Sequence, residues 1–330
     1  MRTAEAFAGI GGISLAFEKA GFTSVYLTDK DEKCAVTLAK NSNLALTVKD
    51  ITRKSEGEYQ SVLADLERVP YEVLLAGFPC QSFSQAGRQE GLHDRQGRGL
   101  LVLELLKIVA KTRPVAIFWE NVPRLTKIDQ GRVWLMILEK LAKLGYAYDW
   151  RILSSVEFGG VPQQRQRLYL VAFADERKLT KFAWPAPRQS QTSWRELLEP
   201  TVAEKYYYFY RRQQREVSKP LWWTALKDYQ WTTDKIYLWR RCGRREYGAG
   251  VCPTLLASMG TGGHNVPLIK DAWGVRKLTP RECARLQGFP DSFVLPATLA
   301  EKTLYQQLGN TVTLPVVERI AKQIKKALQS

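Results

Sequence analysis

The chain has 330 residues, of which 45% are hydrophobic and 25% charged, so it can form one large domain or two modest ones with hydrophobic cores. Lysine and arginine outnumber the acidic residues by 49 to 33. The net charge of +16 favours an anionic partner, DNA or RNA, over a merely solvated basic surface. Five cysteines without a CxxC pair and only two histidines argue against a disulfide framework, a zinc site and a Cys-His or Ser-His-Asp mechanism.

Short apolar strands alternate with helical patterns through the first half of the chain. The expected strands are 3–7, 24–28, 72–77, 115–120 and 167–173, and the expected helices between them include 99–112 and 131–145. This alternation predicts a doubly wound α/β domain with a mainly parallel sheet.

The sequence changes in character after this region. Two prolines and a polar run in 182–194 indicate a linker. The stretch 205–245 then carries eleven Lys and Arg against three acids, with eleven of the 36 aromatic residues. Basic and aromatic side chains interleaved in this way suit phosphate contacts and base stacking; a small aromatic β-domain with a basic exterior is the alternative. An amphipathic helix at 314–329 is expected to pack back on the first domain.

The segment "FAGIGG" (7–12) joins the first strand to a helix, and its Gly9 and Gly11 form the G-x-G of a nucleotide-binding turn. Ser14 stands where a dinucleotide fingerprint has its third glycine, which favours a nucleoside ligand without a diphosphate. Asp29 ends the second strand, where a carboxylate can take ribose hydroxyls, and Asp50 is placed to meet an adenine amino group. We therefore expect an adenosine-type cofactor such as S-adenosylmethionine.

The segment "GFPCQSFS" (77–84) puts Cys80 directly after a strand, at the ligand-binding edge of such a sheet, with Pro79 fixing the backbone before it. A thiolate stabilised by cations or backbone amides is a strong nucleophile. A small buried hydrophobe is the alternative, and we assign the other four cysteines to that role. Residues 84–99, rich in glycine and arginine, have the composition of a basic lid.

Two further pairs of polar residues follow at strand ends. Glu120 and Asn121 end the fourth strand at the same edge as Cys80, where a carboxyl group can hold or donate a proton. Arg165 and Arg167 occupy alternate positions entering the next strand, so both are expected to face one way. Two guanidinium groups on one side can hold a phosphate, a ribose or a substrate carbonyl.

Six segments in order resemble the motifs of the C5-cytosine DNA methyltransferase family, of the bacterial restriction-modification type. They are "FAGIGG", "GFPCQSFS", "ENV", "QQRQRLYLV", "RKLTPRECARLQGFPDSF" and "YQQLGNTVTLPVVERI". The resemblance implies a Rossmann-like S-adenosylmethionine-dependent methyltransferase domain with a smaller, irregular β-rich domain. Its implied boundaries are a catalytic domain at 1–183 completed by 306–330, a target-recognition domain at 184–272, and a hinge and return segment at 273–305.

The resemblance also implies a mechanism. Cys80 would add to C6 of a cytosine flipped out of duplex DNA. Glu120 would contact N3 and the amino group, and Arg165 would hold O2 and favour the thiolate. Arg167 and Gln163 would support the pocket.

The family's cofactor is S-adenosylmethionine, which leaves as S-adenosylhomocysteine. The positions that match its binding motifs are Phe7, Gly9, Ile10, Gly12, Asp29, Asp50, Ile51, Pro79, Asn310 and Val312. Lys30 stands where an aromatic residue often packs on adenine. The expected substrate contacts besides Gln163 are Ser84, Arg88 and Thr254.

Double-stranded DNA is the expected partner of a monomeric enzyme without a metal ion, and a cognate restriction endonuclease fits an enzyme of this kind. With no signal peptide and no bilayer-spanning run, we expect a soluble, cytoplasmic, nucleoid-associated protein without a membrane partner. A related tRNA cytosine methyltransferase, a non-catalytic nucleic-acid binder and a nicotinamide oxidoreductase are the alternatives. The long basic stretch favours DNA over tRNA, and the intact set of Cys80, Glu120 and Arg165 favours an enzyme over a binder.

Overall fold

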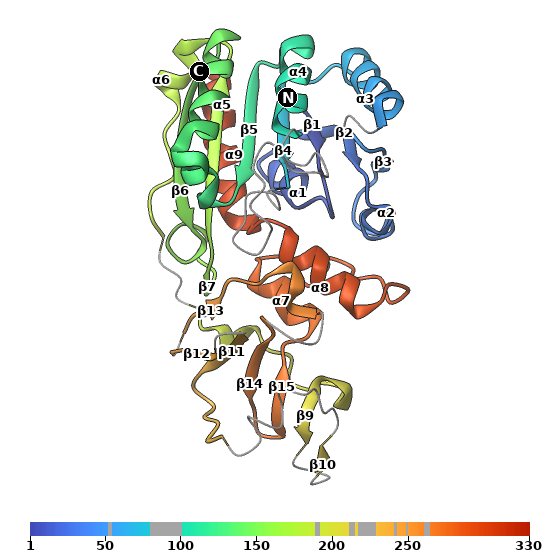
Figure 1. Cartoon of the computed structure of the whole chain (residues 1–330), viewed down its shortest axis with the longest axis vertical. Helices are drawn as coiled ribbons and strands as arrows, with labels where there is room; N and C mark the ends of the chain where they lie inside the picture. Colours follow the sequence, from blue (N-terminus) through green and yellow to red (C-terminus); the bar gives the residue numbers. More distant parts are fainter. Residues whose placement is uncertain are drawn as a thin grey trace. The chain divides into compact units, whose positions relative to one another are not determined.

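The computed structural model describes residues 1–51, 55–79, 101–188, 192–210, 215–216, 229–240, 243–248, 250–260 and 265–330. They form two compact units (Figure 1). The first unit consists of Met1–Ser154, Gln166–Pro187 and Leu314–Ser330, and the second of Ser155–Arg165 and Arg188–Thr313. These two units are defined by compactness alone. The catalytic, target-recognition and hinge boundaries inferred from the sequence therefore stay a prediction.

A mostly parallel sheet forms the centre of the first unit. Its strands, in the order β3-β2-β1-β4-β5-β8-β6, are β3 (Thr47–Val48), β2 (Thr23–Asp29), β1 (Arg2–Ala6), β4 (Val73–Gly77), β5 (Ala116–Asn121), β8 (Gln166–Phe173) and β6 (Ala147–Ser154). The first five are parallel to their neighbours, whereas β8 runs antiparallel to both β5 and β6. The predicted mainly parallel sheet is confirmed, and all five predicted strands are present. The sequence patterns did not reveal β3 and β6.

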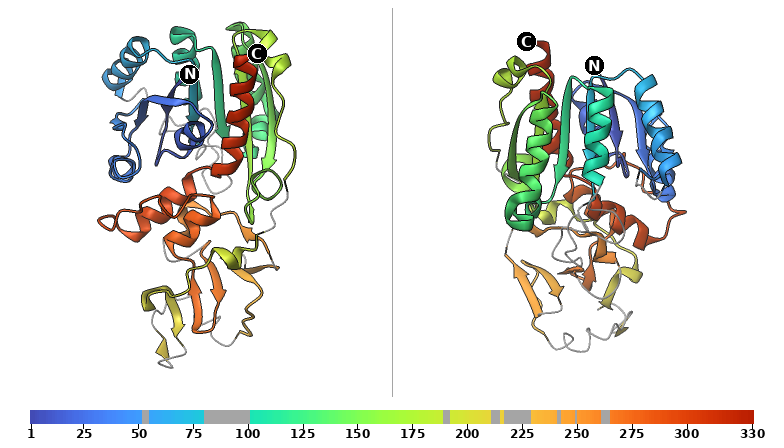
Figure 2. Two further views of the ribbon diagram at one scale, coloured as in Figure 1. Left: turned by 180° about the vertical axis from the view of Figure 1, so that it is seen from behind. Right: turned by 45° about the horizontal axis from the view of Figure 1, so that its top comes forward.

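Helices cover both faces of this sheet (Figure 2). The helices of the unit are α1 (Gly12–Lys19), α2 (Glu32–Leu38), α3 (Glu56–Arg68), α4 (Leu101–Thr112), α5 (Arg132–Lys143), α6 (Glu176–Lys181) and α9 (Leu314–Gln329). On β5, Ile117 and Trp119 belong to the core that α3, α4 and α5 cover. The ring of Phe118 between them packs on Phe17 of α1, at a centroid distance of 5.2 Å. Because side chains alternate along a strand, β5 thus contributes side chains to the core on each face of the sheet.

The C-terminal helix α9 packs on α1 and α6, as predicted, so the end of the chain completes the first unit. Val317, Ile320 and Ile324 are buried on its inner face. On the outer side, the Lys325 ammonium group donates to the carbonyl of Gly21 at a distance of 3.0 Å.

The second unit is built on an antiparallel sheet of the order β10-β9-β15-β14-β11-β12. Its strands are β9 (Tyr207–Tyr210), β10 (Arg215–Glu216), β11 (Ile236–Arg240), β12 (Gly243–Tyr247), β14 (Pro267–Lys270) and β15 (Gly274–Lys277). A second, parallel pair joins β7 (Gln163–Gln164) to β13 (Cys252–Pro253). The helical segments of the unit include η9 (Ala257–Gly260), α7 (Pro280–Leu286) and α8 (Glu301–Asn310).

The aromatic residues described in this unit form mainly a core. Tyr208, Trp231 and Tyr237 pack together with Val266, Leu268 and Val275, and each is less than 9% exposed. Edge-to-face contact of Trp231 with Tyr237, at a centroid distance of 4.7 Å, is typical of a packed interior. For these three rings the expectation of base stacking is wrong, and the alternative of a small aromatic β-domain holds. Trp222 and Trp223 lie outside the described residues.

A buried ion cluster joins β15 to α7. Arg276, 1% exposed, binds both carboxylate oxygens of Glu282 at 2.8 Å and contacts Asp271 Oδ2 at 2.6 Å. Glu282 is also the third helical residue of a capping box with Thr279, followed by Pro280 in the first turn. The segment "RKLTPRE" is therefore a strand end, a turn and a capped helix held by one carboxylate.

Gly309 of α8 lies in contact with the backbone that leads into η9. A Cβ built at this glycine would lie 2.2 Å from the amide nitrogen of Ala257 and 2.3 Å from the carbonyl carbon of Leu256. We expect Gly309→Ala to lower the free energy of unfolding by about 3 kcal/mol, because backbone atoms cannot move aside as a flexible side chain can. Urea titration measures this change.

Gly57 of α3 is the matched control, because no described atom lies within 4 Å of a Cβ placed there. Gly57→Ala is expected to leave the free energy of unfolding unchanged or to raise it by up to about 1 kcal/mol through helix propensity. Equal stability of the two variants would show that α8 does not press on η9.

Candidate active site

The turn after β1 has the tight backbone that its glycines predict. Phe7, Gly9 and Gly11 have φ values of 59°, 54° and 78°, all in the left-handed region. A non-glycine residue such as Phe7 adopts this region at a cost and is found there most often at functional sites. A Cβ at Gly11 would lie 2.5 Å from Leu38 Cδ1, whereas at Gly9 no described atom would lie within 4 Å. A side chain at Gly11 would therefore clash with Leu38, whereas the turn leaves space beside Gly9.

Asp29 is the last residue of β2 and Asp50 follows β3, and because these strands are parallel neighbours, both acids lie at the carboxyl edge of the sheet. Asp29 Oδ2 accepts the Gly9 amide at 2.9 Å, and Oδ1 accepts the Asp31 amide at 3.0 Å. Burial raises the pKa of this carboxyl group. Asp50 Oδ2 lies 3.8 Å from the ammonium group of Lys30, and Ile51 beside it is buried. The lysine found in place of the usual aromatic residue therefore has a carboxylate partner.

Glu5 is an acid within the apolar strand β1 that the sequence patterns did not predict as a site residue. Its side chain is 1% exposed, and Oε2 accepts the amide of Ser14 in the first turn of α1 at 2.9 Å. Burial raises its pKa to about 8. The only sequence signal is a carboxyl residue at an inward position of "TAEAF". Glu5 thus links the strand directly to the helix that follows the glycine turn.

Stability should depend on pH through this group. The pKa of Glu5 is about 8 in the folded protein and near 4.5 when unfolded, so the folded state keeps a proton that the unfolded state loses. Its stabilising contribution is complete below the unfolded pKa and is lost as pH rises through the folded pKa. We expect Glu5→Gln to remove a slope approaching about 1.4 kcal/mol per pH unit in this window. Urea unfolding at several pH values measures the slope; the exposed Glu18→Gln is the control, and parallel curves would refute the expectation.

Glu120 ends β5 and is held by Arg167 of the neighbouring strand β8. Its side chain is 10% exposed, that of Arg167 is 13% exposed, and Arg167 Nε lies 3.1 Å from Glu120 Oε1. On the other side, Gly77 of β4 is the register partner of Glu120, and a Cβ there would lie 3.7 Å from Oε2. Arg167 therefore orients the carboxylate, and the glycine keeps β4 from covering its second oxygen.

Asn121 connects this strand end to the segment before Cys80. Its amide Nδ2 donates to the carbonyl of Phe78 at 3.1 Å, and its Oδ1 accepts the amide of Val122 at 2.9 Å. Pro79, half-buried, follows Phe78. The sequence alone indicated no role for Asn121 beyond its place at the strand end. Cys80, Ser84 and Arg88 lie outside the described residues.

Arg165 belongs to the second unit, where it is 1% exposed. Its Nη1 donates to the carbonyl of Leu255 at 2.9 Å, and its Nη2 donates to the carbonyls of Gly309 at 3.2 Å and Thr311 at 2.6 Å. The two arginines that the spacing predicted as a pair thus have separate partners, Arg167 a carboxylate and Arg165 three carbonyls. Their roles toward a substrate remain predictions.

Other predicted site residues also lie in the second unit. Gln163 is 0% exposed, and the hydroxyl of Thr254 donates to the carbonyl of Gln164. Asn310 is exposed and Val312 is buried, on either side of Thr311. In the first unit, the predicted cofactor residues Ile10 and Gly12 are buried within the turn.

A profile of the family described as C-5 cytosine-specific DNA methylase matches residues 1–326. The chain belongs to this family. As a member, it is a DNA cytosine-5-methyltransferase, and its similarity to Type II methyltransferases supports a restriction-modification type.

Two Type II methyltransferases match this methylase over nearly their whole length. The Type II methyltransferase M.Bsp6I of Bacillus sp. is 38% identical over 99% of both chains. M.HhaI of Haemophilus parahaemolyticus is 30% identical over 99% of this chain and 95% of its own. Among solved structures, the Entamoeba histolytica methyltransferase EhMeth has a TM-score of 0.73 at 21% identity, covering 100% of this chain and 99% of its own. S. pombe Dnmt2 has a TM-score of 0.69 at 19% identity over 100% and 99%, so both show the fold.

The methyl donor that the family implies, S-adenosylmethionine, fits the residues at this edge of the methylase's sheet. Space beside Gly9, the carboxylate of Asp29 fixed by two backbone amides, and the apolar side chain of Ile51 suit a ribose and a base. Within the described part of the chain, no cluster of His, Cys, Asp or Glu is placed to hold a metal ion, and no helix can span a membrane.

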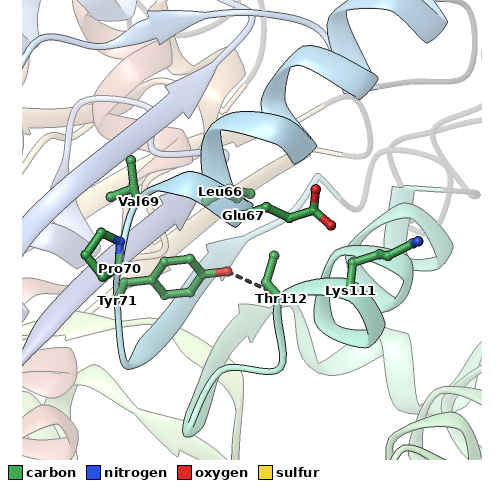
Figure 3. A pocket seen from close by; sticks show the side chains of 7 residues that line it. All are labelled: Leu66, Glu67, Val69, Pro70, Tyr71, Lys111 and Thr112. Atoms are coloured by element: carbon green, nitrogen blue, oxygen red, sulfur yellow. Dashed lines mark hydrogen bonds between the residues drawn. The ribbon is translucent and has the colours of Figure 1, made fainter.

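A cavity of about 200 Å³ lies elsewhere in the methylase's first unit (Figure 3). Its lining residues are Leu66, Glu67, Val69, Pro70, Tyr71, Lys111 and Thr112. The hydroxyl of Tyr71 donates to Thr112 Oγ1 at 2.7 Å across it. Pro70 and Tyr71 precede β4, so the cavity is at the amino end of a strand whose carboxyl end leads to Cys80. It is therefore separate from the candidate active site.

Three described cysteines of the methylase are buried thiols that form no disulfide bond: Cys34, Cys252 and Cys283. Burial raises the pKa of the Cys252 and Cys283 thiols, which disfavours their thiolates. The prediction that these cysteines act as small buried hydrophobes is confirmed, and Cys242 lies outside the described residues.

Proposed function

We propose that the enzyme methylates C5 of a cytosine that is flipped out of a specific duplex DNA sequence, through a covalent bond between Cys80 and C6. The single observation that supports this most is the Glu120 carboxylate, which Arg167 holds at the end of β5. Asn121, the next residue, binds the carbonyl of Phe78, two positions before Cys80. One strand end thus carries both the proposed pocket acid and a contact to the segment that bears the nucleophile.

The chemistry requires activation because C5 of cytosine is a poor nucleophile. When the Cys80 thiolate bonds to C6, the C5=C6 π bond opens, and its electrons delocalise toward N3 and O2 while C5 gains enamine character. In its protonated form, Glu120 contacts N3 and the amino group and transfers its proton to N3 as negative charge develops there; it regains this proton when the thiolate leaves. S-adenosylmethionine, when bound, supplies the methyl group that C5 takes up. Loss of the C5 proton to a base then restores the C5=C6 bond and expels the thiolate.

Arg165 has the proposed role of holding the cytosine O2 as negative charge develops on it. A guanidinium group has five N–H donors in a planar fork, and its three bonds to carbonyls leave its orientation well defined. Arg167 and Gln163 support the pocket, and Ser84, Arg88 and Thr254 contact the substrate. These roles rest on the positions of the residues in the family motifs.

The cofactor contacts are proposed at the turn and strand ends described above. Asp29 binds the ribose, Asp50 with Ile51 binds the adenine, and Phe7, Gly9, Ile10, Gly12 and Pro79 surround the remainder. Asn310 and Val312 are assigned to the same cofactor from their motif alone. S-adenosylhomocysteine is the released product.

Duplex DNA is the proposed substrate, and the net charge of +16 supports it. Flipping a base costs a few kcal/mol, which phosphate contacts and pocket contacts to the extruded base offset. We further propose that the enzyme acts as a monomer and protects DNA from a cognate restriction endonuclease.

Covalent trapping tests this function. Bisulfite sequencing of DNA from cells that express the enzyme first identifies the methylated site. A duplex with 5-fluorocytosine at that site should then form a complex that survives denaturing electrophoresis, because fluorine cannot leave C5 as the proton does. The same duplex with cytosine is the control. Methylation of tRNA instead of DNA, or methyl transfer to DNA without a trapped complex, would contradict the proposal.

A further inference from the structure

We propose that Gln287 is a positioning residue whose side-chain amide holds the carbonyl groups that orient Arg165, and thereby sets the rate of methyl transfer. The inference rests on the proposed role of Arg165 at the cytosine. Gln287 follows α7, is 0% exposed and lies in the second unit, as Arg165 does.

The amide of Gln287 forms three hydrogen bonds to three different segments. Its Nε2 donates to the carbonyl of Leu308 at 3.0 Å. Its Oε1 accepts from Gln163 Nε2 and from Thr313 Oγ1, each at 3.1 Å. Leu308 and Thr313 lie on either side of residues 309–311, so one side chain clamps both ends of this short segment.

That segment carries two of the three carbonyls that bind Arg165, those of Gly309 and Thr311. The third, the carbonyl of Leu255, is tied to Gln287 through one intermediate. Gln163 binds Gln287 with its Nε2 and accepts the amide of Leu255 on its Oε1 at 3.2 Å. Each of these three carbonyl acceptors of the Arg165 guanidinium is therefore on a segment that Gln287 holds directly or through Gln163.

The network closes on the backbone of Arg165 itself. Ser155 Oγ lies 2.7 Å from Thr313 Oγ1 and 3.1 Å from the carbonyl of Arg165, which also accepts the amide of Ser155 at 2.8 Å. Ser155, Gln163, Gln287 and Thr313 are all at most 2% exposed. Both the backbone and the guanidinium group of Arg165 are thus fixed by one buried polar network, in which hydrogen bonds are stronger than in water.

The position requires a primary amide. One oxygen must accept two hydrogen bonds while a nitrogen on the same carbon donates a third. An apolar side chain can form none of these bonds, and a carboxylate lacks the N–H donor. Without it, the carbonyl of Leu308 and the donors of Gln163 and Thr313 lose a partner in a dry interior. Segment 309–311 then relaxes, and Arg165 loses its aim at the substrate carbonyl. A misplacement of about 1 Å can cost about 100-fold in rate.

A double-mutant cycle tests the inference with the full-length enzyme. The variants are Gln287→Met, which keeps the side-chain length without the amide, Arg165→Lys, which keeps the charge without the fork, and the double variant. The readouts are the single-turnover rate of methyl transfer at saturating DNA and donor, the Kd of S-adenosylmethionine, and the midpoint of thermal unfolding. Tyr237→Phe is the matched control, because it removes a buried hydroxyl that bonds Thr232 in the same unit.

Gln287→Met should slow transfer at least about tenfold in the wild-type background but less than about twofold in the Arg165→Lys background. The reason is that both changes disable the same interaction of Arg165 with the substrate. The donor Kd should stay within about twofold, and Tyr237→Phe should slow neither background. Rates that multiply independently, or a wild-type rate for Gln287→Met, would overturn this inference alone. A wild-type rate for Arg165→Lys would instead overturn the proposed role of Arg165 and the inference with it.

If Gln287→Met does not fold, Thr313→Val provides the same cycle. It removes one of the three bonds to Gln287 while keeping the side-chain shape. A slower transfer of about threefold is expected, again absent in the Arg165→Lys background. Rate reductions that multiply independently in the double variant would overturn the inference equally.

Discussion

Replacing Cys80 with serine is expected to lower the rate of methyl transfer by at least about 10³-fold while leaving duplex DNA binding within about twofold. A hydroxyl group is far less acidic than a thiol, so almost no alkoxide forms at neutral pH to attack C6. The two side chains are nearly the same size, so the site keeps its shape for binding. Transfer of a labelled methyl group and gel-shift titration measure the two quantities separately.

Cys34→Ser is the control for this substitution, because Cys34 is a buried thiol on α2 with no proposed role in catalysis. It should retain the transfer rate and form the 5-fluorocytosine complex. Cys80→Ser should form no such complex. Full activity in Cys80→Ser would remove the covalent step from the mechanism, although membership of the family would stand.

Glu120→Gln is expected to lower the transfer rate by about 10² to 10⁴-fold. An amide cannot hold the proton that N3 takes up when Cys80 adds to C6. The substitution also removes the charge that faces Arg167 at 3.1 Å, and a cation left without its buried partner is destabilising. Rates must therefore be measured below the unfolding transition of the variant, with thermal unfolding recorded beside them.

Glu104→Gln separates the two effects. Glu104 of α4 is another buried carboxylate, 2% exposed, with Lys107 at 2.9 Å. Its replacement should affect stability while leaving the transfer rate within about twofold. If Glu104→Gln and Glu120→Gln slowed transfer to the same degree, the effect would reflect stability, and Glu120 would lose its proposed role.

Local patterns in the sequence predicted five strands of the first unit and its helices at 99–112, 131–145 and 314–329. Residues 116–120 of "VAIFWE" are buried as their continuous apolar run indicates, and the apolar face of the helix at 131–145 is buried as its periodicity indicates. The positive φ values at Phe7, Gly9 and Gly11 agree with a turn that glycines alone suggested. Periodicity and turn chemistry act over a few residues, so these features are readable without knowledge of the rest of the chain.

The partners of the polar side chains could not be predicted in the same way. Arg165 and Arg167 are two residues apart, yet one binds carbonyls from 255, 309 and 311 and the other binds Glu120. Likewise, the aromatic residues of 205–245 suggested stacking on bases, whereas Tyr208, Trp231 and Tyr237 form a core. Composition reports which groups are available, and burial decides which of them meet a ligand.

By itself, the sequence determined the family and the doubly wound α/β unit, and it predicted the roles that we propose for Cys80 and Glu120, because motifs and periodicities are encoded in neighbouring residues. Only the tertiary structure decided that β8 runs antiparallel to both β5 and β6, that Glu5 is buried beneath the helix start, and that Gln287 joins the segments around Arg165. The physical reason is distance along the chain. Gln287 and Gln163 are 124 residues apart, and their contact exists only once the segments between them have folded.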